Sequence, residues 1–209
     1  MKPESFEGKL YNPRDVEGKP NTEALEQLRD VEKDLKNNPA FIGIVPGGSR
    51  IKGYSIEGSD IDVLILFDSS KIDSEKDKND FLTEYSFKGF QFLFLDVNLE
   101  KLLPDLQLDP RGDGMGAVIQ RMAALTELVS GHQVGDYRNA IKQSYNQLSK
   151  DARDIVKNRA VDLLMDKEEY AARKIEKRMA DKLNKDSFLE QRRKLWEERY
   201  EQIWGMSAK

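Results

Sequence analysis

The chain has 209 residues, of which 38% are apolar and 34% charged, and its net charge of −4 does not favour a nucleic-acid-binding protein. The longest apolar run, Val63–Phe67, is too short to cross a membrane and no secretory signal follows Met1, so we expect a cytoplasmic protein. The chain has no cysteine and one histidine, His132, which leaves oxygen ligands for any bound metal and so favours Mg²⁺, Mn²⁺ or Ca²⁺.

The first half of the chain is predicted to contain one amphipathic helix and three strands. Apolar residues recur at helical spacing before Asn37, and the strands are short apolar runs. A polar stretch at 68–80 is expected to be a loop. The predicted segments are an irregular arm at 1–20, a helix at 22–37, and strands at 41–45, 61–67 and 90–97.

The second half is predicted to be helical. A glycine-rich loop, Arg111–Gly116, ends the first half, and no strand pattern follows it. The expected helices lie at 117–130, 137–165 and 167–204. We therefore predict a core of strands and helices at 1–110 and a helical region at 111–209.

Two carboxylates precede the strand Ile61–Phe67. Asp60 and Asp62 lie two residues apart, and alternate residues of a strand share a face, so the carboxylates point the same way. Two such groups repel each other, and a divalent cation between them removes the conflict. Asp68 has the same parity but lies roughly 20 Å along the strand, so we interpret it as a turn residue.

Asp96 ends the apolar run of the third strand. A buried carboxylate is costly unless it is paired or metal-bound. If this strand lies beside Ile61–Phe67, three carboxylates can converge and hold two metal ions about 3.5–4 Å apart. The alternative is that Asp96 ends its strand and caps a helix at Leu99–Leu103.

The turn Gly47-Gly48-Ser49 is a candidate phosphate-binding loop. Glycines allow backbone N–H groups to approach an anion closely, and Ser49 can donate to a phosphate. An ordinary turn is the alternative, and the spacing to the aspartate pair argues against it. A P-loop is excluded, because Tyr54 stands where that motif requires lysine.

Gly48-Ser49, ten intervening residues, Asp60-Ile61-Asp62, a following apolar strand and a later strand aspartate, Asp96, resemble the nucleotidyltransferase superfamily of DNA polymerase beta. The resemblance covers residues 22–103 and is greatest to the small stand-alone bacterial and archaeal members. It implies an α+β fold, with a small mixed sheet flanked by helices and extended here by a helical C-terminal half. Lys52-Gly53 occupies the place where these relatives carry Arg-Gly.

The resemblance implies an enzyme that transfers a nucleoside monophosphate from an NTP, with ATP expected, to an acceptor hydroxyl and releases pyrophosphate. Asp60, Asp62 and Asp96 would be the catalytic and metal-binding residues, holding two Mg²⁺ ions that Mn²⁺ could replace. The nucleotide would be bound by Gly47, Gly48, Ser49 and Lys52. The acceptor stays open between an RNA or tRNA end, a protein hydroxyl and a small molecule such as an aminoglycoside. A nucleotide-sensing or scaffold module is the non-enzymatic alternative.

The helical half carries two further patterns. The basic cluster, between Arg173 and Lys185, could bind nucleic acid, but interspersed acids favour a solvated face. An aromatic stripe near the C-terminus, from Trp196 to Trp204, is interpreted as core or as the contact of a homodimer. His132 is expected to be a local hydrogen-bonding residue.

Overall fold

The computed structural model describes residues 22–48, 61–74, 77, 90–107, 115–127, 130–131, 134–178 and 185–205. They fall into two compact units, Met1–Val97 with Leu128–Gln133 and Asn98–Glu127 with Val134–Lys209. The fold is α+β, as predicted, with the sheet in the first unit and most helices in the second. The division lies at Val97 rather than at residue 110, because α4 (Leu99–Leu106) packs on helices of the second unit.

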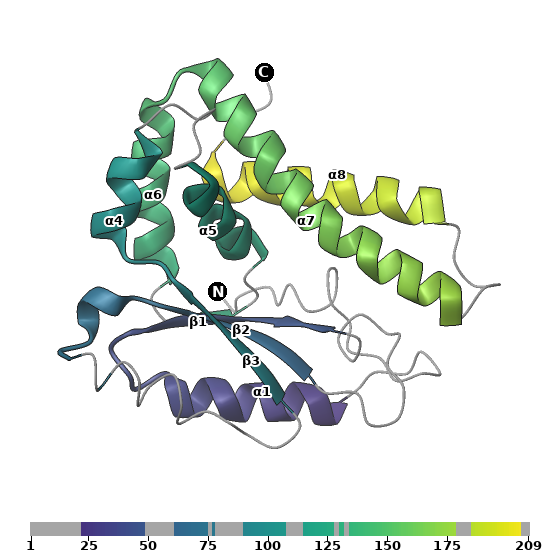
Figure 1. The fold of residues 1–209 in the computed structure, drawn as a ribbon, viewed down its shortest axis with the longest axis horizontal. Helices are drawn as coiled ribbons and strands as arrows, with labels where there is room; N and C mark the ends of the chain where they lie inside the picture. The colour runs from purple at the N-terminus through teal and green to yellow at the C-terminus, as the bar shows by residue number, and fades with distance from the viewer. Residues whose placement is uncertain are drawn as a thin grey trace. The chain divides into compact units, whose positions relative to one another are not determined.

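Four strands of the described chain form one mixed sheet in the order β3-β2-β1-β4 (Figure 1). They are β1 (Phe41–Gly47), β2 (Ile61–Phe67), β3 (Phe90–Asp96) and β4 (Ser130–Gly131). β2 lies between β1, which is antiparallel to it, and β3, which is parallel. The three predicted strands are present, and β1 extends beyond the expected end at Val45. The prediction of no strand after the glycine-rich loop is wrong, because β4 pairs with β1.

Helix α1 (Thr22–Leu35) packs against β1 and runs along the sheet (Figure 1). Leu28, Val31 and Leu35 are buried, at the i, i+3, i+7 spacing that puts side chains on one helix face. The helix ends before the predicted Asn37. The side chain of Asn38 accepts a hydrogen bond from the Ala40 N–H at 2.9 Å, which fixes the turn into β1.

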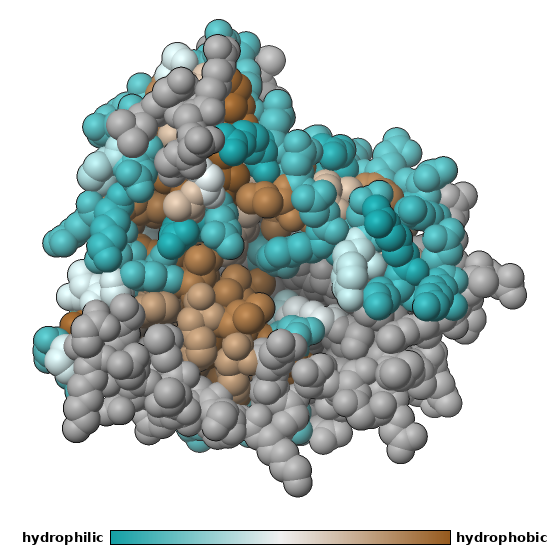
Figure 2. All heavy atoms as spheres, in the orientation of Figure 1, coloured by the Kyte–Doolittle hydropathy of each residue, from teal (hydrophilic) through white to brown (hydrophobic). Residues whose placement is uncertain are grey.

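The two faces of β2 differ in burial. Ile61, Val63 and Ile65 are fully buried on one face, and each contributes roughly 1.5–3 kcal/mol of burial free energy. Asp62 and Leu64, on the other face, are half-buried. Figure 2 shows apolar atoms at the surface over β3, where the side chain of Leu93 is 56% exposed. The face that carries Asp62 therefore includes apolar surface.

The second unit contains α4, α5 (Met115–Glu127), α6 (Val134–Gln147), α7 (Lys150–Arg178) and α8 (Lys185–Trp204). The prediction of one helix over 137–165 is wrong: α6 ends at Gln147, and the Ser149 hydroxyl accepts a hydrogen bond from the Ala152 N–H at 3.2 Å at the start of α7. The helix then continues through residue 166, where a break was predicted. No helix in the described residues is long and apolar enough to span a membrane.

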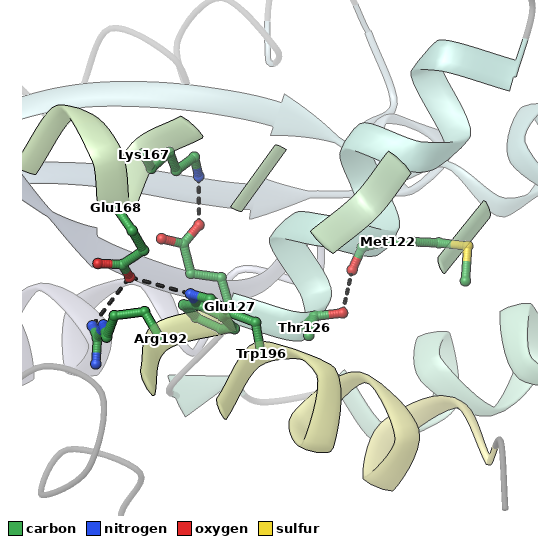
Figure 3. Close-up of polar contacts among 7 residues, drawn as sticks. All are labelled: Met122, Thr126, Glu127, Lys167, Glu168, Arg192 and Trp196. Carbon is green, nitrogen blue, oxygen red and sulfur yellow. Dashed lines mark hydrogen bonds and ion pairs between the residues drawn. The ribbon is translucent and has the colours of Figure 1, made fainter. Parts of the chain in front are cut away.

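A buried polar cluster joins three helices of the second unit (Figure 3). Glu168 of α7 is 1% exposed and accepts hydrogen bonds from Arg192 at 3.1 Å and from Trp196 Nε1 at 3.2 Å, both in α8. Glu127, at the end of α5, accepts from Lys167 of α7. These charge-assisted bonds fix the register of α5, α7 and α8 against one another.

The aromatic stripe of α8 lies in the core of this unit. Trp196, Tyr200 and Trp204 are fully buried, so the interpretation of these residues as core is confirmed. The Tyr200 ring meets Tyr145 of α6 edge-on, with ring centroids 6.1 Å apart. Burial raises the pKa of the Tyr145 phenol to about 12.

Candidate active site

The glycine turn and the Asp-x-Asp motif meet at one end of the sheet. β1 and β2 are antiparallel, and Gly47 at the end of β1 is in register with Asp62 near the start of β2. Antiparallel pairing thus brings the end of one strand beside the beginning of the next. The segment predicted to bind phosphate and a carboxylate predicted to bind metal are therefore neighbours.

Gly48 lies against the Asp62 carboxylate in a backbone conformation that favours glycine. Its φ is +74°, in the left-handed region. A Cβ atom here would lie 2.8 Å from Asp62 Cγ and would overlap Asp62 Oδ2. At Gly47, a Cβ would meet Asp62 Cβ at 3.7 Å, which is an ordinary contact. The close approach of backbone and carboxylate thus depends on Gly48 and not on Gly47.

Three of the predicted site residues, Ser49, Lys52 and Asp60, lie outside the described residues. Asp60 directly precedes Ile61, the first residue of β2. Asp62 itself is half-buried. The structure therefore brings together Gly47, Gly48 and Asp62, and the roles of the other three stay predictions from the sequence.

Asp96 does not lie beside Asp62, so the predicted convergence of three carboxylates is wrong. The register of the parallel strands pairs Asp62 with Gln91 and Phe67 with Asp96. Five residues of strand, about 16 Å, separate the two aspartates along the sheet. Asp96 also shares the sheet face of Phe67, opposite to that of Asp62.

Asp96 instead holds the short helical turn η2 (Ser69–Lys71) that follows β2. Its carboxylate accepts hydrogen bonds from the Ser69 N–H at 3.0 Å and from the Ser69 hydroxyl at 2.6 Å. The alternative prediction named a capping role, but for the helix at Leu99, which Asn98 caps by accepting from the Glu100 N–H. Asp68 accepts from the backbone and hydroxyl of Ser70, so its prediction as a turn residue is confirmed.

The β3 position beside Asp62 is residue 91, which the sequence analysis did not single out. It lies directly across from Asp62, and neighbouring strands are about 4.8 Å apart. The alternation of side chains within one strand can be read from the sequence, but the register between two strands cannot. Which residue of β3 lies beside Asp62 is therefore known only from the pairing of the two strands.

The described residues of the candidate site supply one carboxylate, that of Asp62, and the strand register does not bring Asp96 to it. Carboxylate oxygens are suitable ligands for Mg²⁺ and Mn²⁺, and Asp62 is held at the glycine turn by close packing. Within the described ranges, no three histidine, aspartate or glutamate side chains are grouped to hold a metal ion.

Two basic side chains of α7, those of Arg173 and Lys174, contact neighbouring side chains of the same helix. Arg173 forms an exposed ion pair with Glu169 at 2.9 Å, and Lys174 lies over the ring of Tyr170 at 5.2 Å. Because these charges already have partners within the helix, the contacts favour a solvent-exposed helix face over a nucleic-acid-binding site. His132 and residues 111–114 of the glycine-rich loop lie outside the described residues, and its last two residues, Met115 and Gly116, belong to α5.

Comparison with known families identifies the segment that contains this site. Residues 25–102 match the family model for the nucleotidyltransferase domain. Comparisons with curated proteins and with solved structures gave no significant match. The matched segment includes β1, β2 and β3, and hence the glycine turn and Asp62. Residues 25–102 therefore carry a nucleotidyltransferase domain, as the resemblance to the DNA polymerase beta-like superfamily predicted.

Proposed function

We propose that this protein is a metal-dependent enzyme that transfers a nucleoside monophosphate from an NTP, with ATP as the expected donor, to an acceptor hydroxyl. The observation that carries the proposal is the close approach of the Gly48 backbone to the Asp62 carboxylate. It brings the turn that we propose to bind phosphate beside the aspartate that we propose to bind the metal, within a segment that matches a nucleotidyltransferase domain.

Each side of this junction has its own role. Asp60 and Asp62 would bind a divalent cation, Mg²⁺ or Mn²⁺. When bound, the cation neutralises phosphate charge and polarises the α-phosphate. The turn Gly47-Gly48-Ser49 would donate backbone N–H groups to the β- and γ-phosphates, and Lys52 would add a positive charge near them.

The transfer breaks the phosphoanhydride bond between the α- and β-phosphates and forms a phosphodiester bond to the acceptor, whose hydroxyl proton is lost to solvent. The acceptor hydroxyl oxygen forms a bond to the α-phosphorus while the bond to the pyrophosphate oxygen breaks, and pyrophosphate leaves. Holding the triphosphate between the turn and the carboxylates aligns it for attack by the acceptor. The acceptor classes are an RNA end, a protein hydroxyl and a small molecule.

The experiment is incubation of the full chain with ATP labelled at the α-phosphate, Mg²⁺ and a panel of RNA, protein and aminoglycoside acceptors. We expect label to appear in one acceptor class, and to be lost when Asp60 and Asp62 are both replaced by asparagine. The proposal is wrong if transfer continues in that double variant, because no carboxylate of the motif would then remain.

A second candidate function is a nucleotide-sensing module that binds an NTP without transferring it. The position of Asp96, about 16 Å from Asp62 along the sheet, favours this candidate because it removes one expected catalytic carboxylate. ATP binding that depends on Asp62, with no label transfer to any acceptor, would support sensing over catalysis.

A further inference from the structure

We infer that the acceptor is the hydroxyl of a tyrosine in a protein segment, and that its ring lies on an apolar step formed by Leu64 and Leu93 near Asp62. This rests on the proposed function, because it takes the glycine turn and Asp62 to hold the metal nucleotide. It selects one of the three acceptor classes from the surface that the described residues place next to Asp62.

The strand order fixes the side from which the acceptor approaches. β2, which carries Asp62, has β1 on one side and β3 on the other. The glycine turn lies on the β1 side, where Gly47 pairs with Asp62. Because this turn would hold the β- and γ-phosphates, pyrophosphate leaves on that side. The attacking and leaving oxygens are roughly in line, so the acceptor hydroxyl arrives from the β3 side.

The apolar step lies on that side of the sheet. Leu93 of β3 pairs with Leu64 of β2, two residues or roughly 7 Å along the strand from Asp62 and on the same face. Leu93 is 56% exposed and Leu64 is half-buried, and Figure 2 shows apolar atoms at the surface over β3. The next pair on this face, Leu66 and Leu95, is buried. Of these two leucine pairs, the exposed one is therefore the one nearer to Asp62.

An apolar step distinguishes between the three acceptor classes. RNA is bound through its phosphates by lysine and arginine, and this chain has a net charge of −4. An aminoglycoside carries several ammonium groups, which are stabilised by carboxylates rather than by leucines. Tyrosine combines an apolar ring with a polar tip. Its ring can cover the two leucines while its hydroxyl points along the strand towards the α-phosphate at Asp62.

The place of β3 in the sheet favours a protein segment over a free phenol. β3 is the outermost strand of the sheet on its side, within the residues that the structure describes. An outermost strand offers a row of backbone N–H and C=O groups to which an extended segment can add as a further strand. Alternate residues of such a segment share a face, so one tyrosine can be directed onto the face that carries Asp62.

The transfer to tyrosine is balanced without a further reactant. The phenolic oxygen forms a bond to the α-phosphorus, the anhydride bond to the β-phosphate breaks, and pyrophosphate leaves. The phenolic proton is lost to solvent. The tyrosine then carries a nucleoside monophosphate through a phosphodiester bond.

The test measures the transfer of label from α-labelled ATP by the full chain with Mg²⁺. The acceptors are a peptide with one tyrosine between valines and no other hydroxyl, the same peptide with phenylalanine or serine at that place, N-acetyltyrosine amide, an RNA oligonucleotide and an aminoglycoside. Leu93→Asn removes an apolar side chain from the step. Leu163→Asn, at a leucine of α7 that is 39% exposed, is the matched control. Circular dichroism verifies that each variant is folded.

We expect label in the tyrosine peptide and none in its phenylalanine form. Leu93→Asn should raise the KM for the tyrosine peptide about tenfold, because the ring loses apolar contact. The KM for ATP should change much less in this variant. Both KM values should stay within about twofold of wild type in Leu163→Asn.

The inference is overturned, with the proposed function intact, if RNA or the aminoglycoside is labelled in place of the tyrosine peptide. Equal rates with the serine peptide, or with N-acetyltyrosine amide, would also overturn it, because the ring or the peptide backbone would then not matter. A wild-type KM for the peptide in Leu93→Asn would remove the apolar step from the acceptor site. If no acceptor is labelled, the proposed function fails as well.

Discussion

Replacing Gly48 by alanine tests the junction between the glycine turn and Asp62. The backbone at this position has a φ of +74°, and the left-handed conformation costs a residue with a Cβ about 1–2 kcal/mol. The new Cβ would also lie 2.8 Å from Asp62 Cγ, so the carboxylate has to move away. We therefore expect a loss of about 1–3 kcal/mol in unfolding free energy, because strain and displacement add.

Urea unfolding of Gly48→Ala, followed by circular dichroism, measures the first effect. Gly47→Ala is the matched control for stability, because its Cβ would make only an ordinary contact at 3.7 Å, and it should cost clearly less. Calorimetry with Mn²⁺ measures the displacement of Asp62, for which we expect affinity to fall at least about tenfold in Gly48→Ala. Equal stability of the two variants, together with wild-type Mn²⁺ affinity in Gly48→Ala, would refute this reasoning.

Two further predictions concern the helical unit. Glu168→Ala should lower the unfolding free energy by about 3–5 kcal/mol, because it leaves Arg192 without the carboxylate that it meets at 3.1 Å in a buried cluster. Arg193→Ala breaks an exposed ion pair instead and should cost about 1 kcal/mol or less in the same urea titration, so similar losses would contradict the assigned burial. The pKa of Tyr145 is raised to about 12, so between pH 10 and 12 the unfolded chain loses this proton first, and stability should fall as pH rises through that window. Urea titrations at pH 9 and 11 check this, and Tyr145→Phe should reduce the fall; an undiminished fall would mean that another group is responsible.

Short-range patterns of apolar and polar residues in the sequence predicted most of the helices and strands. β2 has its predicted bounds, because a short apolar run flanked by polar residues can be recognised from composition alone. β4 was missed because two residues carry no periodicity, and its pairing with β1 is a tertiary contact. The break between α6 and α7 was missed because its signal is one serine, Ser149, in a continuous helical pattern.

The candidate site was predictable where it depends on local sequence and not where it depends on register. Gly48 and Asp62 meet because β1 and β2 are antiparallel, which places the turn after β1 beside the motif at the start of β2. Asp96 was assigned wrongly because nothing in an isolated strand fixes its alignment with a parallel neighbour. Asp96 lies five residues along β3 from the position beside Asp62, and there it accepts two hydrogen bonds from Ser69 in the turn after β2.

The most direct test of the central claim is calorimetric titration of the chain with Mn²⁺ and ATP, compared between wild type and Asp62→Asn. We predict that the wild type binds the metal nucleotide and that Asp62→Asn weakens binding by about tenfold or more, because a ligand charge beside the glycine turn is lost. Equal affinity of the two proteins, or no binding by the wild type, would contradict a nucleotide site at this end of the sheet.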